Sequence, residues 1–291
     1  MDEDGFKLSE ARVGIVGLGL MGASLALDLR GLCAELVGVS RSPETLAYAL
    51  DHHIVDRVTD FDSSLDCDLL VLAAPVRTII RQLQQMGAAS GRAARPTVVL
   101  DLGSTKQEIV RAMQTLPVRF DPIGGHPMCG KEVAGIRHAE TGLYRDKTFI
   151  LTPLNRTSKR ALALVHEALA AIGSHPLVLS PERQDQLVAM TSHLPYLVSC
   201  ALVNAALSRE DPQLWTVAAS GFRDTSRLAA SELTMMMDIL LTNRAAVLDA
   251  LRCYRIELDL LMGAVEAGEE GPLQDALLPA QRQRAQMSQR Q

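Results

Sequence analysis

The stretch RVGIVGLGLMGASLALDLRGL, residues 12–32, carries the clearest indication of the fold. Its first part is a short apolar run that predicts a buried strand over 12–17, and its second part has a helical pattern over 21–32. The segment GLGLMG at 17–22 joins them, which places a GxGxxG pattern in its proper strand-to-helix context. In such a turn the first glycine permits a tight bend, the second lets the backbone approach a pyrophosphate, and the third allows close helix packing. The stretch therefore predicts a Rossmann-like unit that binds a dinucleotide.

Apolar runs and helical segments alternate up to residue 180, a rhythm typical of βαβ units with a parallel sheet. After residue 180 the pattern is almost wholly helical to about 268. We expect an α/β doubly wound parallel sheet over residues 1–180 and an all-helical substrate-binding and dimerisation domain over 181–291, frayed after about 278. Further strands are expected at 35–40, 68–75, 97–103, 120–127, 147–153 and 175–180.

The helical region begins with a long segment, 182–207, that is apolar on most of its faces. Such a helix has to be buried on several sides, which favours packing against both its own domain and a second subunit. Pro195 within it is expected to kink the helix or to remove one backbone hydrogen bond. The segment therefore predicts a homodimer formed through the C-terminal helices.

Composition narrows the class of partner. The 291 residues are 47% hydrophobic and 22% charged, with a net charge of −5, so no broad basic field is available for nucleic acid or an anionic membrane. The acidic start MDEDGFKLSE lacks the features of a secretory signal, and no uninterrupted apolar run reaches the roughly 18 residues of a membrane span. Five scattered cysteines fit reduced thiols and no metal site. We expect a cytoplasmic protein with a small-molecule substrate.

The end of the second strand indicates which dinucleotide is bound. An acidic residue there would bond the ribose 2′-hydroxyl of NAD, but this chain has Ser40 and Arg41. A hydroxyl and a guanidinium suit the 2′-phosphate of NADP, which a carboxylate would repel. We expect NADP to be preferred over NAD, with a solvated surface charge as the alternative role of Arg41. The expected cofactor contacts are Gly17, Gly19, Leu20, Met21, Gly22, Ser40, Arg41 and Pro75.

Five blocks in a fixed order carry a family resemblance. They are the glycine turn, DLGSTK at 101–106, GGHPMCG at 124–130 continuing into YRDKTFILTP at 144–153, SHLP at 192–195 and GFRDTSR at 221–227. Together they span most of residues 12–245, and the chain resembles the prephenate and arogenate dehydrogenases. The resemblance implies hydride transfer from a cyclohexadienol to NAD(P) with loss of carbon dioxide, the last oxidative step toward tyrosine.

The resemblance also assigns roles to residues. His126 is expected to accept the proton of the substrate's C4 hydroxyl, because imidazole ordinarily titrates near neutral pH. Ser104 is expected to share that bond or to orient His126; its alternative role is to cap a helix, since Ser104 and Gln107 are spaced as a capping box. His193 is expected to contact the substrate, with a buried structural histidine as the alternative.

The substrate's carboxylates require fixed cations, for which arginine is suited. Arg227 matches the family's carboxylate-binding arginine, and Arg223 is expected to support it; a solvated, salt-bridged face is the alternative for both. Glu132 is hypothesised to pair with Arg227 in the empty site and to close it, so that Glu132→Gln weakens substrate discrimination.

The sequence leaves the substrate and two alternative functions undecided. Tyr196 stands where some relatives have histidine, so side-chain recognition cannot be transferred, and the choice between prephenate and arogenate stays open with a lean toward arogenate. A β-hydroxyacid dehydrogenase would need a lysine in the second domain, but no lysine follows Lys159. A dinucleotide-binding protein without catalytic activity is the remaining alternative, which His126, Ser104 and Arg227 disfavour.

Overall fold

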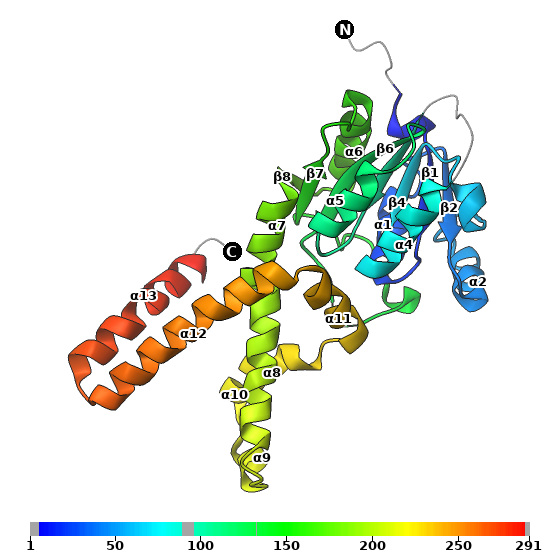
Figure 1. Cartoon of the computed structure of the whole chain (residues 1–291). Coiled ribbons are helices and arrows are strands. Elements are labelled where there is room, and N and C mark those ends of the chain that lie inside the picture. The colour runs from blue at the N-terminus through cyan, green and yellow to red at the C-terminus, as the bar shows by residue number, and fades with distance from the viewer. Residues whose placement is uncertain (1–5, 89–95, 132, 289–291) are drawn as a thin grey trace. The chain divides into compact units, whose positions relative to one another are not determined.

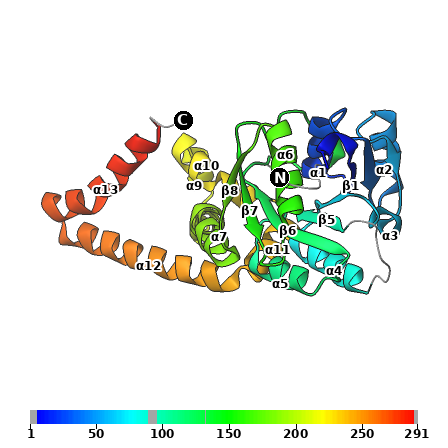
Figure 2. The same cartoon turned by 90° about the horizontal axis from the view of Figure 1, so that it is seen from above.

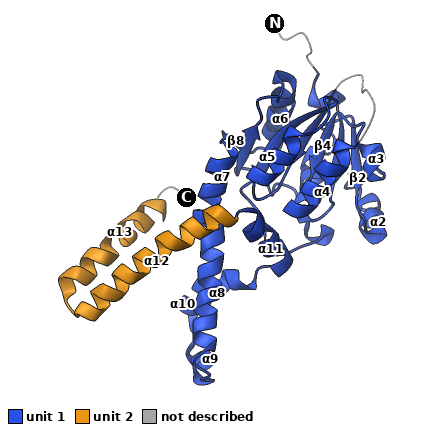
Figure 3. Ribbon diagram, viewed as in Figure 1, with its two compact units in different colours: residues 1–243 blue, residues 244–291 orange. Residues whose placement is uncertain are grey.

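The computed structural model describes residues 6–88, 96–131 and 133–288. Its internal contacts divide the chain into two compact units, residues 1–243 and residues 244–291, which Figure 3 colours blue and orange. The sequence boundary expected near residue 180 does not coincide with this division, because the helix that follows it packs on the sheet domain. That boundary stays a prediction.

An eight-stranded sheet forms the centre of the first unit, in the order β3-β2-β1-β4-β5-β6-β7-β8 (Figure 1). The first six positions reproduce the order of a dinucleotide-binding sheet. Neighbouring strands are parallel except β6 and β7, which are antiparallel. The strands are β1 Arg12–Val16, β2 Glu35–Val39, β3 Arg57–Val58, β4 Leu69–Leu72, β5 Thr97–Asp101, β6 Phe120–Pro127, β7 Thr148–Pro153 and β8 His175–Val178.

Helices cover both faces of this sheet, as Figure 2 shows from above. On β4, Leu69 and Val71 belong to the apolar cluster under α1 and α6, whereas Leu70 and Leu72 belong to the cluster under α4 and α5. Successive side chains of a strand point to opposite faces, so a strand that is apolar throughout is buried on both. The helices are α1 Leu20–Leu29, α2 Pro43–Asp51, α3 Phe61–Ser64, α4 Val76–Gly87, α5 Gln107–Gln114 and α6 Lys159–Ala171, with the 3₁₀ turns η1 Leu8–Glu10 and η2 Ile136–His138.

The helical part of the first unit begins with α7 Pro181–Val188, a π-helical turn η3 Ala189–His193 and α8 Leu194–Leu207, which run on without interruption. Pro195 lies in the first turn of α8, so the π turn takes up the backbone irregularity that the proline imposes. By length and composition alone residues 181–207 are apolar enough to cross a membrane, a test that buried helices of soluble proteins also pass. The remaining elements are α9 Gln213–Val217, α10 Ser220–Ser226, η4 Arg227–Ala230 and α11 Leu233–Thr242.

The second unit is a pair of helices, α12 Arg244–Ala267 and α13 Glu270–Ser288. Gly268, with φ of 65°, occupies the left-handed conformation at the turn between them, which glycine adopts at little cost. The tail was expected to fray after about residue 278, but the helix continues to Ser288 with Pro279 inside it. Its polar composition is that of an exposed helix, and contact with α12 supports it.

Candidate active site

The glycine turn between β1 and α1 has the shape of a dinucleotide cradle. Gly17 has φ of 103°, and a Cβ there would lie 2.3 Å from the carbonyl oxygen of Ala73. A Cβ on Gly22 would lie 2.0 Å from the carbonyl oxygen of Gly17. At Gly19 an added Cβ would meet no described atom within 4 Å, so the middle glycine faces open space. The residues therefore fit a pyrophosphate above Gly19.

The N-terminus of α1 supplies donors for that group. Gly19 is the N-cap, and no side chain caps the first turn. Its free N–H groups and the positive end of the helix dipole favour an anion. The buried Tyr144 hydroxyl donates a hydrogen bond of 2.7 Å to the carbonyl oxygen of Met21, which ties this turn to the segment after β6.

The residues expected at the adenosine end lie on the same rim. Ser40 is half-buried directly after β2, and its hydroxyl accepts a hydrogen bond of 3.2 Å from the Ser42 N–H. Arg41 is exposed beside it. Pro75, a further expected cofactor contact, is exposed at the N-cap of α4, in the connection from β4 to that helix.

His126 lies within β6, where it is paired with Ile150 of β7. The two glycines that precede it allow close approach to neighbouring strands. A Cβ on Gly124 would lie 1.9 Å from the Thr152 hydroxyl oxygen, and one on Gly125 would lie 2.6 Å from the Asp101 carbonyl oxygen. The imidazole is half-buried at the carboxyl end of the strand.

Gln184 of α7 joins His126 to Ser104. The Gln184 side chain is fully buried, and its Nε2 lies 3.1 Å from His126 Nδ1 and 3.0 Å from the Ser104 carbonyl oxygen. Ser104 and His126 are therefore brought together through a third residue. The expected capping box is wrong: α5 begins at Gln107 with Lys106 as its N-cap, and no side chain of that local segment caps it.

Asp185 caps α5 instead. Its carboxylate accepts hydrogen bonds of 2.7 Å from the Lys106 N–H and 3.0 Å from the Gln107 N–H. A carboxylate at a helix N-terminus satisfies free donors and complements the dipole. Because Asp185 belongs to α7, this contact fixes the first helix of the helical part against the sheet.

A buried ion pair lies behind His126. The Lys106 ammonium contacts the Asp101 carboxylate, and both side chains are fully buried. The same carboxylate accepts hydrogen bonds of 2.8 Å from the Gly103 N–H and 3.0 Å from the Gly125 N–H. Burial lowers the pKa of Lys106 and raises that of Asp101, while their attraction opposes both changes.

The electrostatic setting keeps His126 neutral. Burial, together with the nearby Lys106 and His193, lowers its pKa from the usual 6.5 to about 3. The near-neutral titration from which its role was inferred therefore does not hold in this site. His126 offers a neutral imidazole throughout the physiological pH range.

His193 ends the π turn and is almost fully buried. Its Nδ1 lies 3.2 Å from Asn243 Nδ2, which also donates a hydrogen bond of 2.8 Å to the Asp185 carbonyl oxygen. Burial lowers the pKa of His193 to about 4. His193 is therefore linked through Asn243 to the residue that caps α5.

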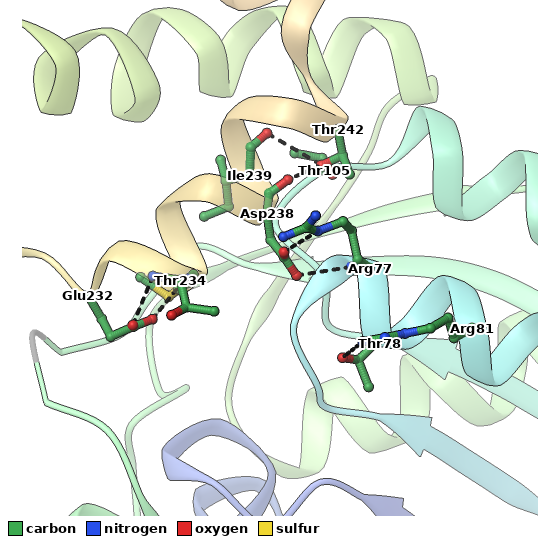
Figure 4. Close-up of polar contacts among 10 residues, drawn as sticks. Arg77, Thr78, Arg81, Thr105, Glu232, Thr234, Asp238, Ile239 and Thr242 are labelled. Carbon is green, nitrogen blue, oxygen red and sulfur yellow. Dashed lines mark hydrogen bonds and ion pairs between the residues drawn. The ribbon is translucent and has the colours of Figure 1, made fainter.

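Helix α11 is held against the sheet domain by two further contacts (Figure 4). Asp238 accepts a hydrogen bond of 3.2 Å from the Arg77 N–H at the start of α4, and its other oxygen pairs with the Arg77 side chain. The hydroxyls of Thr105 and Thr242 are 2.8 Å apart. At the other end of the helix Glu232 caps α11 through the N–H groups of Thr234 and Met235.

The expected carboxylate-binding residues lie on the helical part. Arg223 on α10 and Arg227 on η4 are exposed, and both elements pack on α8, the helix that follows His193. Glu132 lies outside the described residues, so its pairing with Arg227 stays a prediction. Among the described residues no group of three or more His, Cys, Asp or Glu side chains is arranged to hold a metal ion.

Five residues of the site were not singled out from the sequence: Asp101, Lys106, Gln184, Asp185 and Asn243. The first two stand in the DLGSTK block, and a buried strand that ends in Asp was the available signal. For the two amides no local signal exists, because their histidine partners are 58 and 50 residues away.

A hollow of about 670 Å³ lies elsewhere, between α5 and the segment that follows β7. Its described lining includes Gln107, Arg111, Asn155 and Arg156 but neither histidine nor any residue of the glycine turn. The cradle and the two histidines, rather than the size of this hollow, therefore locate the candidate active site.

The buried neutral His193 predicts a loss of stability in acid. Above pH 6.5, the usual pKa of histidine, His193 is neutral in both the folded and the unfolded state. Between pH 6.5 and the folded-state pKa of about 4, His193 binds a proton only in the unfolded state. The free energy of unfolding should fall by about 1.4 kcal/mol per pH unit for this group in that window. The free energy of unfolding, measured with urea at several pH values, should fall less steeply with decreasing pH in His193→Asn, by that amount per pH unit. An equal pH dependence in parent and variant would exclude the effect.

Comparisons with known proteins agree with this architecture. Residues 25–178 match the family model described as prephenate dehydrogenase, nucleotide-binding domain, and residues 180–278 match prephenate dehydrogenase, dimerization domain. The chain is 34% identical to prephenate dehydrogenase of Bacillus subtilis (strain 168) over 87% of this chain and 69% of that protein.

Two solved structures are similar over nearly the whole chain. Prephenate dehydrogenase from A. aeolicus, in complex with hydroxyphenyl propionate and NAD+, has a TM-score of 0.87 and 30% identity, covering 98% of this chain and 100% of that one. Synechocystis arogenate dehydrogenase has a TM-score of 0.81 and 32% identity, and the match covers 95% of this chain and 99% of that one.

Proposed function

Because this chain belongs to the prephenate dehydrogenase family, we propose that it oxidises prephenate or arogenate by hydride transfer to NAD(P) with loss of carbon dioxide. This is the last oxidative step toward tyrosine. One observation carries the proposal: His126 and the glycine turn lie at the same edge of the sheet. Strands β1, β4, β5 and β6 are parallel neighbours, so the turn after β1, Ser104 after β5 and His126 near the end of β6 share the carboxyl edge where such sheets bind ligands.

The proposed reaction does not remove the proton of the substrate's C4 hydroxyl overall. Hydride leaves C4 with its electron pair, and the pair of the bond to the departing carboxylate enters the ring, which becomes aromatic. The hydroxyl hydrogen is still present on the product phenol. A partner at the C4 hydroxyl therefore has to orient it and favour the developing charge, and a strong base is not required.

His126 is the residue proposed to contact that hydroxyl. A neutral imidazole is able to hydrogen-bond an alcohol, and its low pKa is compatible with a reaction that consumes no proton. Ser104 is proposed to support it at the end of β5. The bound nicotinamide supplies the hydride acceptor, and the chain's own task is to hold C4 against it.

The substrate's carboxylates are proposed to bind on the helical side of the site. Arg227 is the proposed cation for one of them, with Arg223 in support, and His193 is proposed to contact the substrate from the start of α8. Glu132 is proposed to pair with Arg227 before substrate binds. These roles are supported by the packing of α10 and η4 on α8, the helix that follows the π turn.

NADP is the proposed cofactor, because Ser40 and Arg41 stand where an acidic residue would select NAD. Arg41→Ala should lower kcat/KM for NADP by about 10-fold to 100-fold, the loss expected for one charge-assisted contact, and should change kcat/KM for NAD little. Initial rates with each cofactor at saturating substrate measure this. An equal loss with both cofactors, or a parental preference for NAD, would contradict it.

The proposed activity is tested by offering prephenate and arogenate separately and following reduced cofactor by absorbance. Turnover of at least one of them is expected, and the ratio of the two values of kcat/KM identifies the substrate. The lean toward arogenate rests on Ser40-Arg41 and on the GFRDTSR block. Absence of turnover with both, in folded protein that binds NADP, would overturn the proposal.

We also propose that the enzyme is a cytoplasmic homodimer that pairs through its C-terminal helices. In the single chain α12 leaves large apolar side chains exposed, among them Ile256 at 57%, Leu260 at 61% and Val265 at 66%. A helix that is apolar on an uncovered face favours a protein partner. Sedimentation of the purified protein should give twice the mass of one chain.

A further inference from the structure

Both histidines of the site are held by a carboxamide in the same way. In one pair Gln184 Nε2 lies 3.1 Å from His126 Nδ1 and 3.0 Å from the Ser104 carbonyl oxygen. In the other, Asn243 Nδ2 lies 3.2 Å from His193 Nδ1 and 2.8 Å from the Asp185 carbonyl oxygen. Each amide is buried, and each has a buried oxygen with no partner among the described residues.

The backbone carbonyl decides which end of the amide faces the imidazole. A carbonyl oxygen only accepts hydrogen bonds, so the amide atom 3.0 Å from the Ser104 oxygen has to be the nitrogen. One hydrogen of that NH₂ group points to Ser104, which leaves the other for His126 Nδ1. A nitrogen that accepts a hydrogen bond carries no hydrogen of its own. The neutral ring then carries its hydrogen on Nε2.

We propose that Gln184 is a positioning residue that fixes neutral His126 with its hydrogen on Nε2 before substrate binds. A carboxylate at this place would accept from Nδ1–H and stabilise the charged ring, whereas the amide donates to Nδ1 and disfavours a proton there. Asn243 donates to Nδ1 of His193 in the same way, so two separate amide–histidine pairs have the same arrangement.

The charges around His126 act in the same direction. Lys106 and His193 lower its pKa, and the Lys106 ammonium is itself paired with Asp101. The Asp185 carboxylate, which follows Gln184 on α7, is engaged with the N-terminus of α5. None of these groups supplies His126 with an acceptor for a second ring hydrogen.

The consequence for the proposed reaction concerns the ring nitrogen that meets the substrate. Because Gln184 occupies Nδ1, Nε2 is the nitrogen left for the C4 hydroxyl. Nε2 accepts from that hydroxyl only when the ring hydrogen is on Nδ1, which costs the hydrogen bond from Gln184. The amide therefore sets how readily His126 accepts. This inference rests on the proposed function only for its effect on catalysis, because the tautomer belongs to the enzyme without substrate.

The test is histidine-ring 15N NMR of the substrate-free enzyme, with the His126 and His193 signals assigned from His126→Asn and His193→Asn. Both rings are expected to be neutral with the hydrogen on Nε2 from pH 8 down to pH 5. This measurement needs no substitution at Gln184. An Nδ1–H ring at His126, or titration of His126 near pH 6.5, would overturn the proposal.

Gln184→Glu keeps the shape of the side chain but replaces the donor by an acceptor. It should move the His126 hydrogen to Nδ1 and raise the pKa of His126 by about 1 to 3 pH units. The value of kcat should then fall as the pH is lowered through that raised pKa. The matched control Asn243→Asp should move the His193 hydrogen to Nδ1 and leave the His126 hydrogen on Nε2. Unchanged His126 signals in Gln184→Glu would refute the role of Gln184, and failure of all turnover in the parent would refute the proposed function instead.

Discussion

Replacing His126 by asparagine is expected to lower kcat by about 100-fold to 10,000-fold, the range that a positioned hydrogen-bonding or proton-transferring side chain contributes. The amide keeps polarity and approximate size but does not place an imidazole nitrogen at the C4 hydroxyl. The dissociation constant for NADP should stay within about twofold of the parental value, because the cofactor cradle is formed by Gly17, Gly19 and Gly22, which lie between the end of β1 and the first turn of α1. Steady-state kinetics and a fluorescence titration with NADP measure the two quantities.

His175→Asn is the matched control for this variant. His175 starts β8, is exposed and is not part of the amide–histidine pairs. Its kcat should equal the parental value. A His126→Asn enzyme that turns over at the parental rate would remove His126 from the chemistry, whereas a loss of NADP binding in parallel with kcat would indicate a structural defect.

Replacing Lys106 by methionine is expected to lower the free energy of unfolding by about 3–5 kcal/mol. The Asp101 carboxylate would stay buried, with the N–H groups of Gly103 and Gly125 as its remaining donors. Removing one partner of a buried pair leaves a charge without compensation, which costs more than the pair itself contributes. Urea unfolding of parent and variant at pH 7 measures the difference.

The double variant Asp101→Asn, Lys106→Met separates charge from packing. Because it leaves no uncompensated charge, its free energy of unfolding should lie above that of the Lys106 single variant. A single variant that costs less than about 1 kcal/mol would show that the pair is solvated in solution, and a double variant no more stable than the single one would show that packing dominates.

Local patterns were sufficient for most of the fold. The glycine turn at 17–22 and the apolar runs that follow it predict the strand-and-helix order, because a strand buried on both faces is recognisable by its uniform apolarity. The direction of β7 was not predictable in this way. An antiparallel neighbour carries no signature in the strand itself and follows from the path of the connection after β6.

In the candidate site, the sequence singled out residues that stand in recognisable blocks, and it did not single out the residues that hydrogen-bond to them. His126 and Ser104 stand in recognisable blocks, but the Gln184 amide that joins them comes from α7. The predicted cap by Ser104 failed because Asp185, also from α7, offers a carboxylate at the same helix end. Contacts of this kind depend on how two distant segments meet, which no window of local sequence encodes.

Substrate deuterated at C4 tests whether hydride transfer is coupled to decarboxylation. The deuterium is expected in the reduced cofactor, one carbon dioxide is expected for each cofactor reduced, and the phenol product is expected to carry no deuterium at C4. Deuterium found in water, or reduced cofactor formed without carbon dioxide, would contradict hydride transfer coupled to decarboxylation at this site.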